Sequence, residues 1–448
     1  MGPWLVQNSV YRNIYAFFDG FMPAQLGWLA YFLAGFTVMF ILINGVLLLA
    51  AGMVYAERRL LGRFQVRLGP NRVGPFGLLQ PFADIVKLLL KEDVVPRGAD
   101  RLLFTLAPVM MVAPLFLITA VVPFGKNSYL ANLNVGVLYL VAVTAISTLA
   151  VFLGGWATGN KYAMFGAMRA VAQLISYEVP LVLALVGVVL LTGSMALVQV
   201  VEAQRLPFLL LQPLGFFVFF CATSAELNRA PFDLMEAESE IIAGYHIEYS
   251  GMRFGLFQLA EFGGVVVSSA VMATLFLRGW ENPFVPQGWT QVLPSHLWFL
   301  LKTALFVFLF IWVRATLPRL RIDQVMGLAW KVLLPLALIN IVVTGIEVWL
   351  WPRPTTAQLW AMVLINWAVA GACLVGFSTL MERWGRRPTA TVVPVRLPVE
   401  VRYALWIGRA EGDDGNPGQL SAEALHYSIP GAEGAPAPSL SGRGLRVV

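Results

Sequence analysis

Long apolar segments separated by charged connections make up most of this chain. A transmembrane helix needs about 20 predominantly apolar residues, and nine segments reach or approach that length. Six contain no charged residue, whereas the last three in the following list contain Glu261, Lys302 and Glu347, respectively. The nine segments are 31–56, 102–122, 135–158, 179–201, 208–225, 359–380, 256–277, 297–313 and 332–351. Because a transmembrane β-barrel requires short segments of alternating polarity, the pattern predicts an all-α polytopic membrane protein with about nine transmembrane helices.

Composition excludes a soluble protein. Of the 448 residues, 58% are hydrophobic and only 12% are charged, and the mean hydropathy is +0.73. A soluble domain usually carries about 25% charged residues, so lipid must cover much of this surface. Two cysteines and three histidines give no disulfide framework, zinc site or iron–sulfur ligand set. The chain also has no phosphate-binding glycine loop or catalytic triad pattern, so nothing indicates a soluble enzyme site.

Lysine and arginine are distributed unevenly between the two sides of these segments. Alternate connections, together with the tail, carry 25 of the 31 basic residues. Since basic residues accumulate on the cytoplasmic side, we expect the N-terminus outside and the tail inside. No basic signal-peptide region precedes the first segment. The predicted divisions are an outer N-terminal segment 1–28, a membrane core 29–351 with eight transmembrane helices, an additional ninth helix in 352–381, and a Gly/Pro-rich, cytoplasmic, partly disordered tail 382–448.

The first cytoplasmic connection combines a basic loop with an amphipathic helix. Residues 57–77 read ERRLLGRFQVRLGPNRVGPFG, and their glycines and prolines predict a shaped loop. In the segment that follows, Gln80, Asp84, Lys87 and Lys91 fall on one stripe of a helix opposite apolar residues, which is typical of a helix lying in the membrane interface. A simple positive-inside anchor would explain the arginines, but not the turn chemistry of GPNRVGP.

The connection after residue 225 is unusually acidic. Between 226 and 261 it holds seven of the chain's 25 acidic residues: Glu226, Asp233, Glu236, Glu238, Glu240, Glu248 and Glu261. A solvated acidic loop is the ordinary interpretation of such a run. Here, however, apolar residues interleave with the acids, and the run continues into a membrane segment. Several carboxyls in a partly buried segment cannot all stay ionised, so this stretch is a candidate for proton exchange.

Charged residues within membrane segments are costly and usually functional. Glu261 lies near the cytoplasmic end of its segment, and Glu178 is expected at the start of the segment 179–201, beside Pro180. Lys302 and Glu347 lie nearer the outer ends of theirs, from where Lys302 can extend to the interface. Glu261 is therefore the strongest functional candidate among the three charges inside segments.

Three stretches resemble the family of H subunits of bacterial NADH:quinone oxidoreductase, or respiratory complex I. They read AERRLLGRFQVRLGPNRVGPFGLLQPFADIVKLLLKED, AELNRAPFDLMEAESEIIAGYHIEYSGMRFGLFQLAEF and IWVRATLPRLRIDQVMGLAWKVLLPLAL. The resemblance covers roughly residues 29–351. It implies a bacterial inner-membrane subunit that contacts peripheral-arm quinone-module subunits and other membrane-arm subunits, and binds no nucleic acid. Quinone would be the substrate, reached from the bilayer beside the first span, the interfacial helix and the sixth span. Iron–sulfur clusters and FMN would belong to partner subunits, because this chain would bind no cofactor.

The resemblance also implies site residues, position by position. The quinone-binding candidates are Arg58, Arg63, Arg67, Phe82, Asp84, Lys87, Phe232, Arg253 and Arg321. The candidates for a path that couples quinone reduction to proton translocation are Glu178, Asp233, Glu236, Glu238, Glu240, Glu248 and Glu261. Most family members have eight core spans, so the ninth segment and the tail depart from the pattern.

Two alternatives remain open from the sequence. Membrane-bound hydrogenase-type complexes use a homologous subunit with other electron donors or acceptors. A stand-alone proton or cation transporter would act without partners, and would be expected to show internal repeats with broken helices. If iron–sulfur and flavin subunits purified together with the chain, a multi-subunit oxidoreductase would be favoured over a stand-alone transporter.

Overall fold

The structure is a computed structural model, and it describes residues 9–22, 26–233, 244–282 and 294–385. The chain divides into two compact units, Met1–Ser378 and Thr379–Val448. Of the second unit only residues 379–385 are described, as the end of the last helix. All of the sites below lie in the first unit.

Helices account for the regular structure of the described residues, and no strand occurs among them. In chain order they are α2 (Ser9–Asp19), α3 (Gly27–Phe64), η2 (Pro75–Gly77), α4 (Gln80–Leu90), α5 (Arg101–Val121), α6 (Gly136–Ala157), α7 (Lys161–Thr192), α8 (Leu197–Ala203), α9 (Phe208–Leu211), α10 (Pro213–Glu226), η3 (Gly244–His246), α12 (Gly251–Phe276), α13 (Ser295–Thr316), α14 (Ile322–Leu328), η4 (Ala329–Leu333), α15 (Leu334–Leu350) and α16 (Thr356–Gly385). Within the described ranges, eight helical runs are long and apolar enough to cross a membrane, counting α14 to α15 as one. The predicted all-α polytopic class is confirmed.

The predicted span 208–225 is interrupted. It forms the four-residue α9 and the 14-residue α10, with Gln212 between them at φ −131° and ψ 64°. Pro213 follows directly, and a proline has no N–H with which to continue a helix. Irregular backbone is tolerated at membrane depth only where protein buries it or water lines it. Gln212 meets the first condition because it is 1% exposed.

Two predicted boundaries are wrong. The first span does not end at residue 56, because α3 continues to Phe64 and carries ERRLLGRF as helix; most of these residues are good helix formers. The fourth span is not 179–201. α7 begins at Lys161 after the cap Asn160, runs through Pro180 and ends at Gly193, whose φ is 65°. Glu178 therefore lies in the middle of a helix and not at its start.

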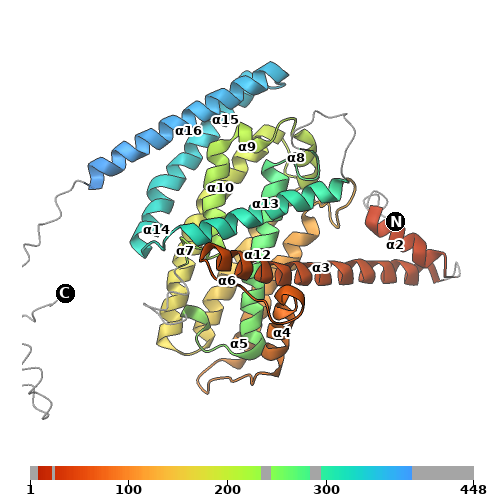
Figure 1. Cartoon of the computed structure of the whole chain (residues 1–448). Helices are drawn as coiled ribbons and strands as arrows, with labels where there is room; N and C mark the ends of the chain where they lie inside the picture. Colours follow the sequence, from red (N-terminus) through yellow and green to blue (C-terminus); the bar gives the residue numbers. More distant parts are fainter. Residues whose placement is uncertain (1–8, 23–25, 234–243, 283–293, 386–448) are drawn as a thin grey trace, which may run out of the picture. The chain divides into compact units, whose positions relative to one another are not determined.

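Two helices organise the core of the first unit. α7 packs against α6, α10 and α15, while α12 packs against α3, α4, α5 and α13. The helix α2 packs on α3 at its N-terminal end, where the Tyr11 hydroxyl donates to Tyr31 O at 3.1 Å (Figure 1). Near the other end of α3, Arg229 of the connection after α10 and Arg314 of α13 contact Glu57. This arrangement brings some of the predicted site residues to one end of the bundle.

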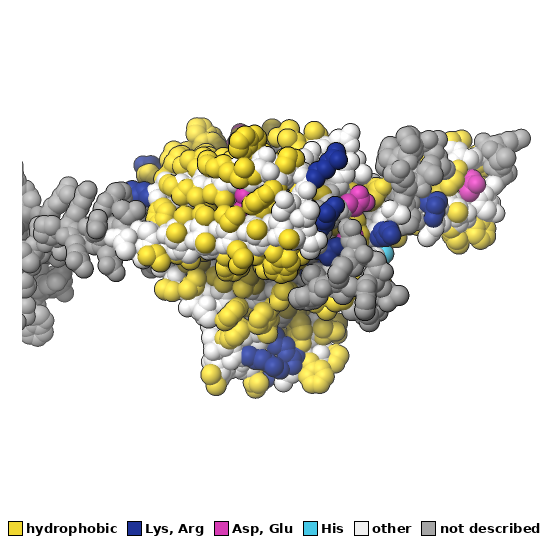
Figure 2. All heavy atoms as spheres, turned by 90° about the horizontal axis from the view of Figure 1, so that it is seen from above, with side chains coloured by type: hydrophobic (Ala, Val, Ile, Leu, Met, Phe, Trp, Pro, Cys, Tyr) yellow, Lys and Arg dark blue, Asp and Glu magenta, His cyan; other side chains and the backbone are white. Residues whose placement is uncertain are grey.

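Apolar side chains cover much of the outside. On α3 they include Phe32, Phe36, Phe40 and Leu48, all of which are exposed. Figure 2 shows one face on which hydrophobic side chains dominate and charged ones gather in a few places. A surface of this kind is stable in contact with lipid and not with water. The chain is accordingly a multi-pass membrane protein.

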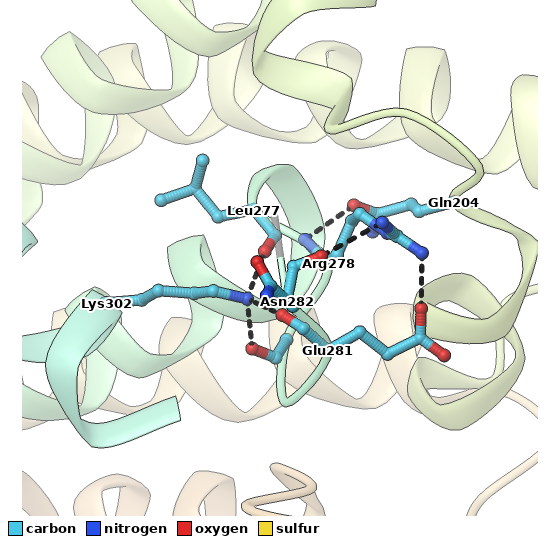
Figure 3. A network of polar contacts seen from close by, with 7 residues as sticks. Gln204, Leu277, Arg278, Glu281, Asn282 and Lys302 are labelled. Atoms are coloured by element: carbon cyan, nitrogen blue, oxygen red, sulfur yellow. Dashed lines mark hydrogen bonds and ion pairs between the residues drawn. The ribbon is translucent and has the colours of Figure 1, made fainter. Parts of the chain in front are cut away.

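Lys302 does not extend to the interface as its position suggested. Its side chain is buried, and Nζ donates to Leu277 O at 2.6 Å, to Gly279 O at 2.8 Å and to Glu281 O (Figure 3). These carbonyls follow the last turn of α12, where backbone oxygens lack helical partners. Lys302 thus fixes the end of α12 to α13.

The same network extends to α8 through Gln204. Its Oε1 accepts from Arg278 N at 2.8 Å, and its Nε2 donates to Thr274 O and Leu275 O, both at 3.0 Å. The Arg278 side chain is paired with Glu281 at 2.5 Å (Figure 3). The network is therefore structural, and it occupies the end of the bundle away from the predicted site.

Candidate functional site

The basic loop 57–77 folds back against the end of α3. An added Cβ at Gly77 would lie 2.3 Å from Pro70 O, and one at Gly69 would lie 2.9 Å from the Cα of Arg59. Gly77 also has a φ of 78°, which side chains other than glycine rarely adopt. Arg59 Nη1 donates to Phe76 O at 2.7 Å and so closes the loop. The predicted shaped loop is confirmed from about residue 65, whereas 57–64 is helical.

An ion pair joins this helix end to the interfacial helix. Arg58 Nη1 lies 2.5 Å from Asp84 Oδ2, and Gln80 Nε2 donates to Asp84 Oδ1 at 3.1 Å. Three residues of the predicted stripe lie on α4, namely Gln80, Asp84 and Lys87. Lys91 follows the end of the helix. Other quinone candidates at this end are exposed: Arg63, Arg67, Phe82 and Lys87.

A buried ion cluster lies directly beneath that pair. Glu57 of α3 accepts from Arg229 Nη1 at 2.9 and 2.8 Å, and it also accepts from Arg314 Nη1 of α13. Glu57 and Arg229 are each 3% exposed. The Arg229 guanidinium further lies 4.7 Å from the ring centroid of Phe262. The cluster brings together one residue from each of the three stretches that carry the family resemblance.

A second contact joins the last two of these stretches. Arg319 Nη2 lies 2.8 Å from Asp233 Oδ2, and Leu320 N donates to Pro231 O at 3.1 Å. Phe232, between them, is buried with its ring 5.2 Å from that of Tyr177. Phe232 therefore belongs to the core of the bundle. Asp233, expected on a proton path, is ion-paired with an arginine.

Further candidates lie around the connection that precedes α12. Arg253 Nε is 3.2 Å from Asp93 Oδ2, and its guanidinium lies 5.2 Å from the ring centroid of Phe104. Glu248 Oε1 accepts from Asn160 Nδ2 at 2.7 Å. His246 is buried beside them, and burial lowers its pKa to about 4, so that the ring is neutral at physiological pH. Arg321, the remaining quinone candidate, is exposed just before α14.

The acidic candidates are only partly brought together. Glu178 of α7 is half-buried and lies close enough to Glu226 of α10 for the two carboxyls to interact electrostatically. Glu261 is half-buried on α12. Three of the proton-path candidates lie outside the described residues, so their place in the path stays a prediction: Glu236, Glu238 and Glu240.

An apolar cavity of about 730 Å³ opens between α3, α12 and α13. Its lining is hydrophobic apart from Thr119, Thr303 and His296, together with a few backbone groups. The predicted spans 31–56 and 256–277 flank it, in line with the expected access route from the bilayer. The interfacial helix α4 and the nine quinone candidates do not contribute to its lining.

The sequence interpretation missed the residues of the buried ion cluster. Glu57, Arg229 and Arg314 are not among the site candidates that the sequence predicts. A usable signal was present, since all three lie inside the stretches that carry the family resemblance. In the part of the chain that the structure describes, no group of three or more His, Cys, Asp or Glu side chains could hold a metal ion.

Comparison with known proteins gives a consistent result. The family model described as NADH dehydrogenase matches residues 36–345. The H subunit of NADH-quinone oxidoreductase from Dehalococcoides mccartyi strain CBDB1 is 50% identical over 355 residues, covering 79% of this chain and 95% of that protein. The chain belongs to the family of NADH-quinone oxidoreductase H subunits.

Other relatives in this family match a similar share of the chain. The H subunit from Brevibacillus brevis is 51% identical, covering 70% of this chain and 94% of the relative. The protein named as H subunit 2 from Syntrophobacter fumaroxidans is 49% identical, covering 72% and 98%, respectively. The family model spans α3 to the greater part of α15, and α16 follows the matched range.

Proposed function

We propose that this chain is the membrane subunit of a proton-pumping NADH:quinone oxidoreductase, in the inner membrane of a bacterial cell. It forms part of the quinone-binding chamber and of the acidic path that couples quinone reduction to proton translocation. Iron–sulfur clusters and FMN are held by partner subunits of the peripheral arm, and other membrane-arm subunits pack beside it. The names of its relatives support this assignment.

The observation that carries the proposal is the cluster around Glu57. It fastens the C-terminal part of α3, the connection after α10 and the end of α13 to one point. Above it, Arg58 and Asp84 form a partly exposed pair that is accessible to a polar ligand. A polar headgroup bound in a mostly apolar pocket needs only a few fixed donors. Exposed arginines such as Arg63 and Arg67 supply further donors at the same end.

Access from the bilayer is supported by the cavity beside α3 and α12. Its apolar lining suits a hydrophobic tail, whereas Arg58, Arg63 and Asp84 lie at or after the C-terminal end of α3. A quinone that enters from the bilayer would therefore have its apolar tail in the cavity and its polar headgroup near the charged groups.

The chamber is tested by quinone reduction in the assembled complex. Asp84→Asn and Arg63→Gln should each lower NADH:quinone reduction while NADH oxidation by a hydrophilic artificial acceptor continues. Asp19→Asn on α2 is the matched control, since Asp19 lies at the far end of α3. If both activities fall together in a variant, that residue serves assembly and the chamber assignment is wrong for it.

The proton path is proposed to run through Glu236 and Glu240, backed by Glu178, Asp233, Glu238, Glu248 and Glu261. The electrostatic interaction between Glu178 and Glu226 supports a role of these carboxyls in the same path. Glu236→Gln and Glu240→Gln keep the side-chain shape and should lower quinone reduction and proton pumping together. An assembled variant with the wild-type rate and stoichiometry would contradict the path at that residue.

A further inference from the structure

A polar face of α15 points into the protein near the end of the bundle away from Glu57. Asn340, Thr344 and Glu347 are spaced i, i+4 and i+7, which places them on one side of the helix. Their exposed fractions are 2%, 0% and 4%. The opposite side is apolar and exposed, for example at Val342 and Trp349. Since Glu347 follows Leu334 by thirteen residues, it lies about 20 Å along the helix from its start.

The inner part of this face meets the break between α9 and α10. Gln212 Nε2 donates to Thr344 Oγ1 at 2.9 Å and to Gly187 O at 3.0 Å. The Asn340 amide fits against Gly187 and Gly215, where an added Cβ would lie 2.7 and 3.0 Å, respectively, from Nδ2. Asn340 Nδ2 and Gln212 Oε1 have no hydrogen-bond partner within the described chain, although both are buried. A buried donor and acceptor of this kind are groups that water characteristically satisfies.

Glu347 itself is held by the helix that follows the matched range of the family. Asn366 Nδ2 of α16 donates to both carboxyl oxygens, at 2.9 and 2.8 Å. The same nitrogen also donates to Met362 O at 3.1 Å, and Asn366 is 5% exposed. Among the described residues, neither lysine nor arginine forms an ion pair with Glu347.

The chemistry of this pair suits a carboxyl that gains and loses a proton. An amide carries two N–H donors and an acceptor oxygen. It can donate to the ionised carboxylate, and after rotation it can accept from the O–H of the carboxylic acid. A guanidinium has donors only, so it satisfies the carboxylate and not the acid. With Asn366 as partner, neither protonation state of Glu347 leaves a buried polar group unsatisfied.

We propose that Glu347 is a proton-exchanging carboxyl of the membrane core, positioned by Asn366 of α16 and approached through the polar groups of Gln212, Asn340 and Thr344. One carboxyl oxygen takes a proton from water, forming an O–H bond, and later returns it to water on the other side, with no electron transferred. This inference rests on the proposed function, because it adds Glu347 to the proton path of that complex.

The test uses the whole complex reconstituted in liposomes, with Glu347→Gln as the main variant. Glu347→Gln should assemble, keep NADH oxidation by a hydrophilic acceptor, and pump fewer protons per NADH than the wild type. Infrared difference spectra across a pH titration should contain a carboxylic acid C=O band that the variant lacks. A wild-type pumping ratio, or a spectrum unchanged by the substitution, would overturn the proposal.

A second variant keeps the inference testable if Glu347→Gln fails to assemble. Asn366→Leu retains the carboxyl but removes its partner, and it should displace the pH midpoint of the band. Asn44→Leu is the matched control, because Asn44 is an exposed amide on α3 whose Nδ2 bonds only to Phe40 O. An unchanged midpoint in Asn366→Leu would overturn the proposal. A wild-type complex that neither reduces quinone nor pumps would instead refute the proposed function.

Discussion

Two carboxyl groups with nearly equal burial lie at opposite ends of the membrane core and have different partners. Glu57 is 3% exposed and accepts from Arg229 and Arg314. Glu347 is 4% exposed and, among the described residues, accepts from the amide of Asn366 alone. The depth of burial is the same, but one site contains two cations and the other contains none among the described residues.

The comparison separates two uses of a buried acid. Two arginines donate to Glu57 and tie three chain segments together, so this carboxyl serves as a fixed anchor. An uncharged amide leaves the charge of Glu347 uncompensated in a membrane, where isolated charges are costly. The anchor therefore depends on keeping its charge, and the site at Glu347 is compatible with losing it.

Of the substitutions that distinguish the two sites, Glu57→Gln should lower the stability of the complex the most. It leaves two arginines side by side, one of them deeply buried, with no negative partner. Breaking a buried ion pair in this way costs about 3–5 kcal/mol. We expect loss of assembled complex, or a strongly lowered unfolding temperature in detergent, measured against Asp19→Asn. An assembled Glu57→Gln complex of wild-type stability would show that the cluster is not an anchor.

Asn366→Leu should have a smaller effect, because it removes an uncharged partner. The Glu347 carboxyl would then be buried without a hydrogen bond, at a cost of about 1–3 kcal/mol. The double variant Glu347→Leu with Asn366→Leu removes both groups and should recover part of that loss, since residues in contact are not additive. Unfolding of the purified complex in detergent measures both. Strictly additive losses would contradict a direct interaction between the two side chains.

Much of the fold could be predicted from hydropathy, because membrane spans are long and lipid permits few charges within them. The break at Gln212 could not, since its stability depends on contacts with Gly187 and Thr344. The true start of α7 was also missed, because Lys161, Arg169 and Glu178 interrupt the apolar residues of its first half. Hydropathy therefore locates lipid-facing segments better than segments buried among other helices.

The candidate site was only partly predictable for a related reason. Arg58 and Asp84 belong to adjacent elements, and their pairing follows from a short loop. The partners of Glu57 lie 172 and 257 residues away in the sequence. Only the packed bundle brings these ends together. The resemblance to a family marked the three stretches, but it did not say which of their charges meet.

Glu347→Gln sharpens the comparison because the same substitution is made at both carboxyls. Glutamine is uncharged and can still form a hydrogen bond with the Asn366 amide, so no buried charge loses a partner. We expect a stability change within about 0.5 kcal/mol, as for substitutions without a large destabilising mechanism. Unfolding in detergent, run beside Glu57→Gln, gives the contrast directly. Equal destabilisation of the two variants would remove the distinction between an anchor and an exchangeable site.

A similarly small stability effect is expected at the partly exposed pair next to the anchor. The Arg58 side chain is 48% exposed and that of Asp84 is 25% exposed. Such pairs contribute about 0–1 kcal/mol, and salt screens them further. Asp84→Asn should thus leave the unfolding temperature of the complex almost unchanged while quinone reduction falls. A large loss of stability would instead place Asp84 with Glu57 as part of the anchor, and its effect on quinone reduction would then be a consequence of folding.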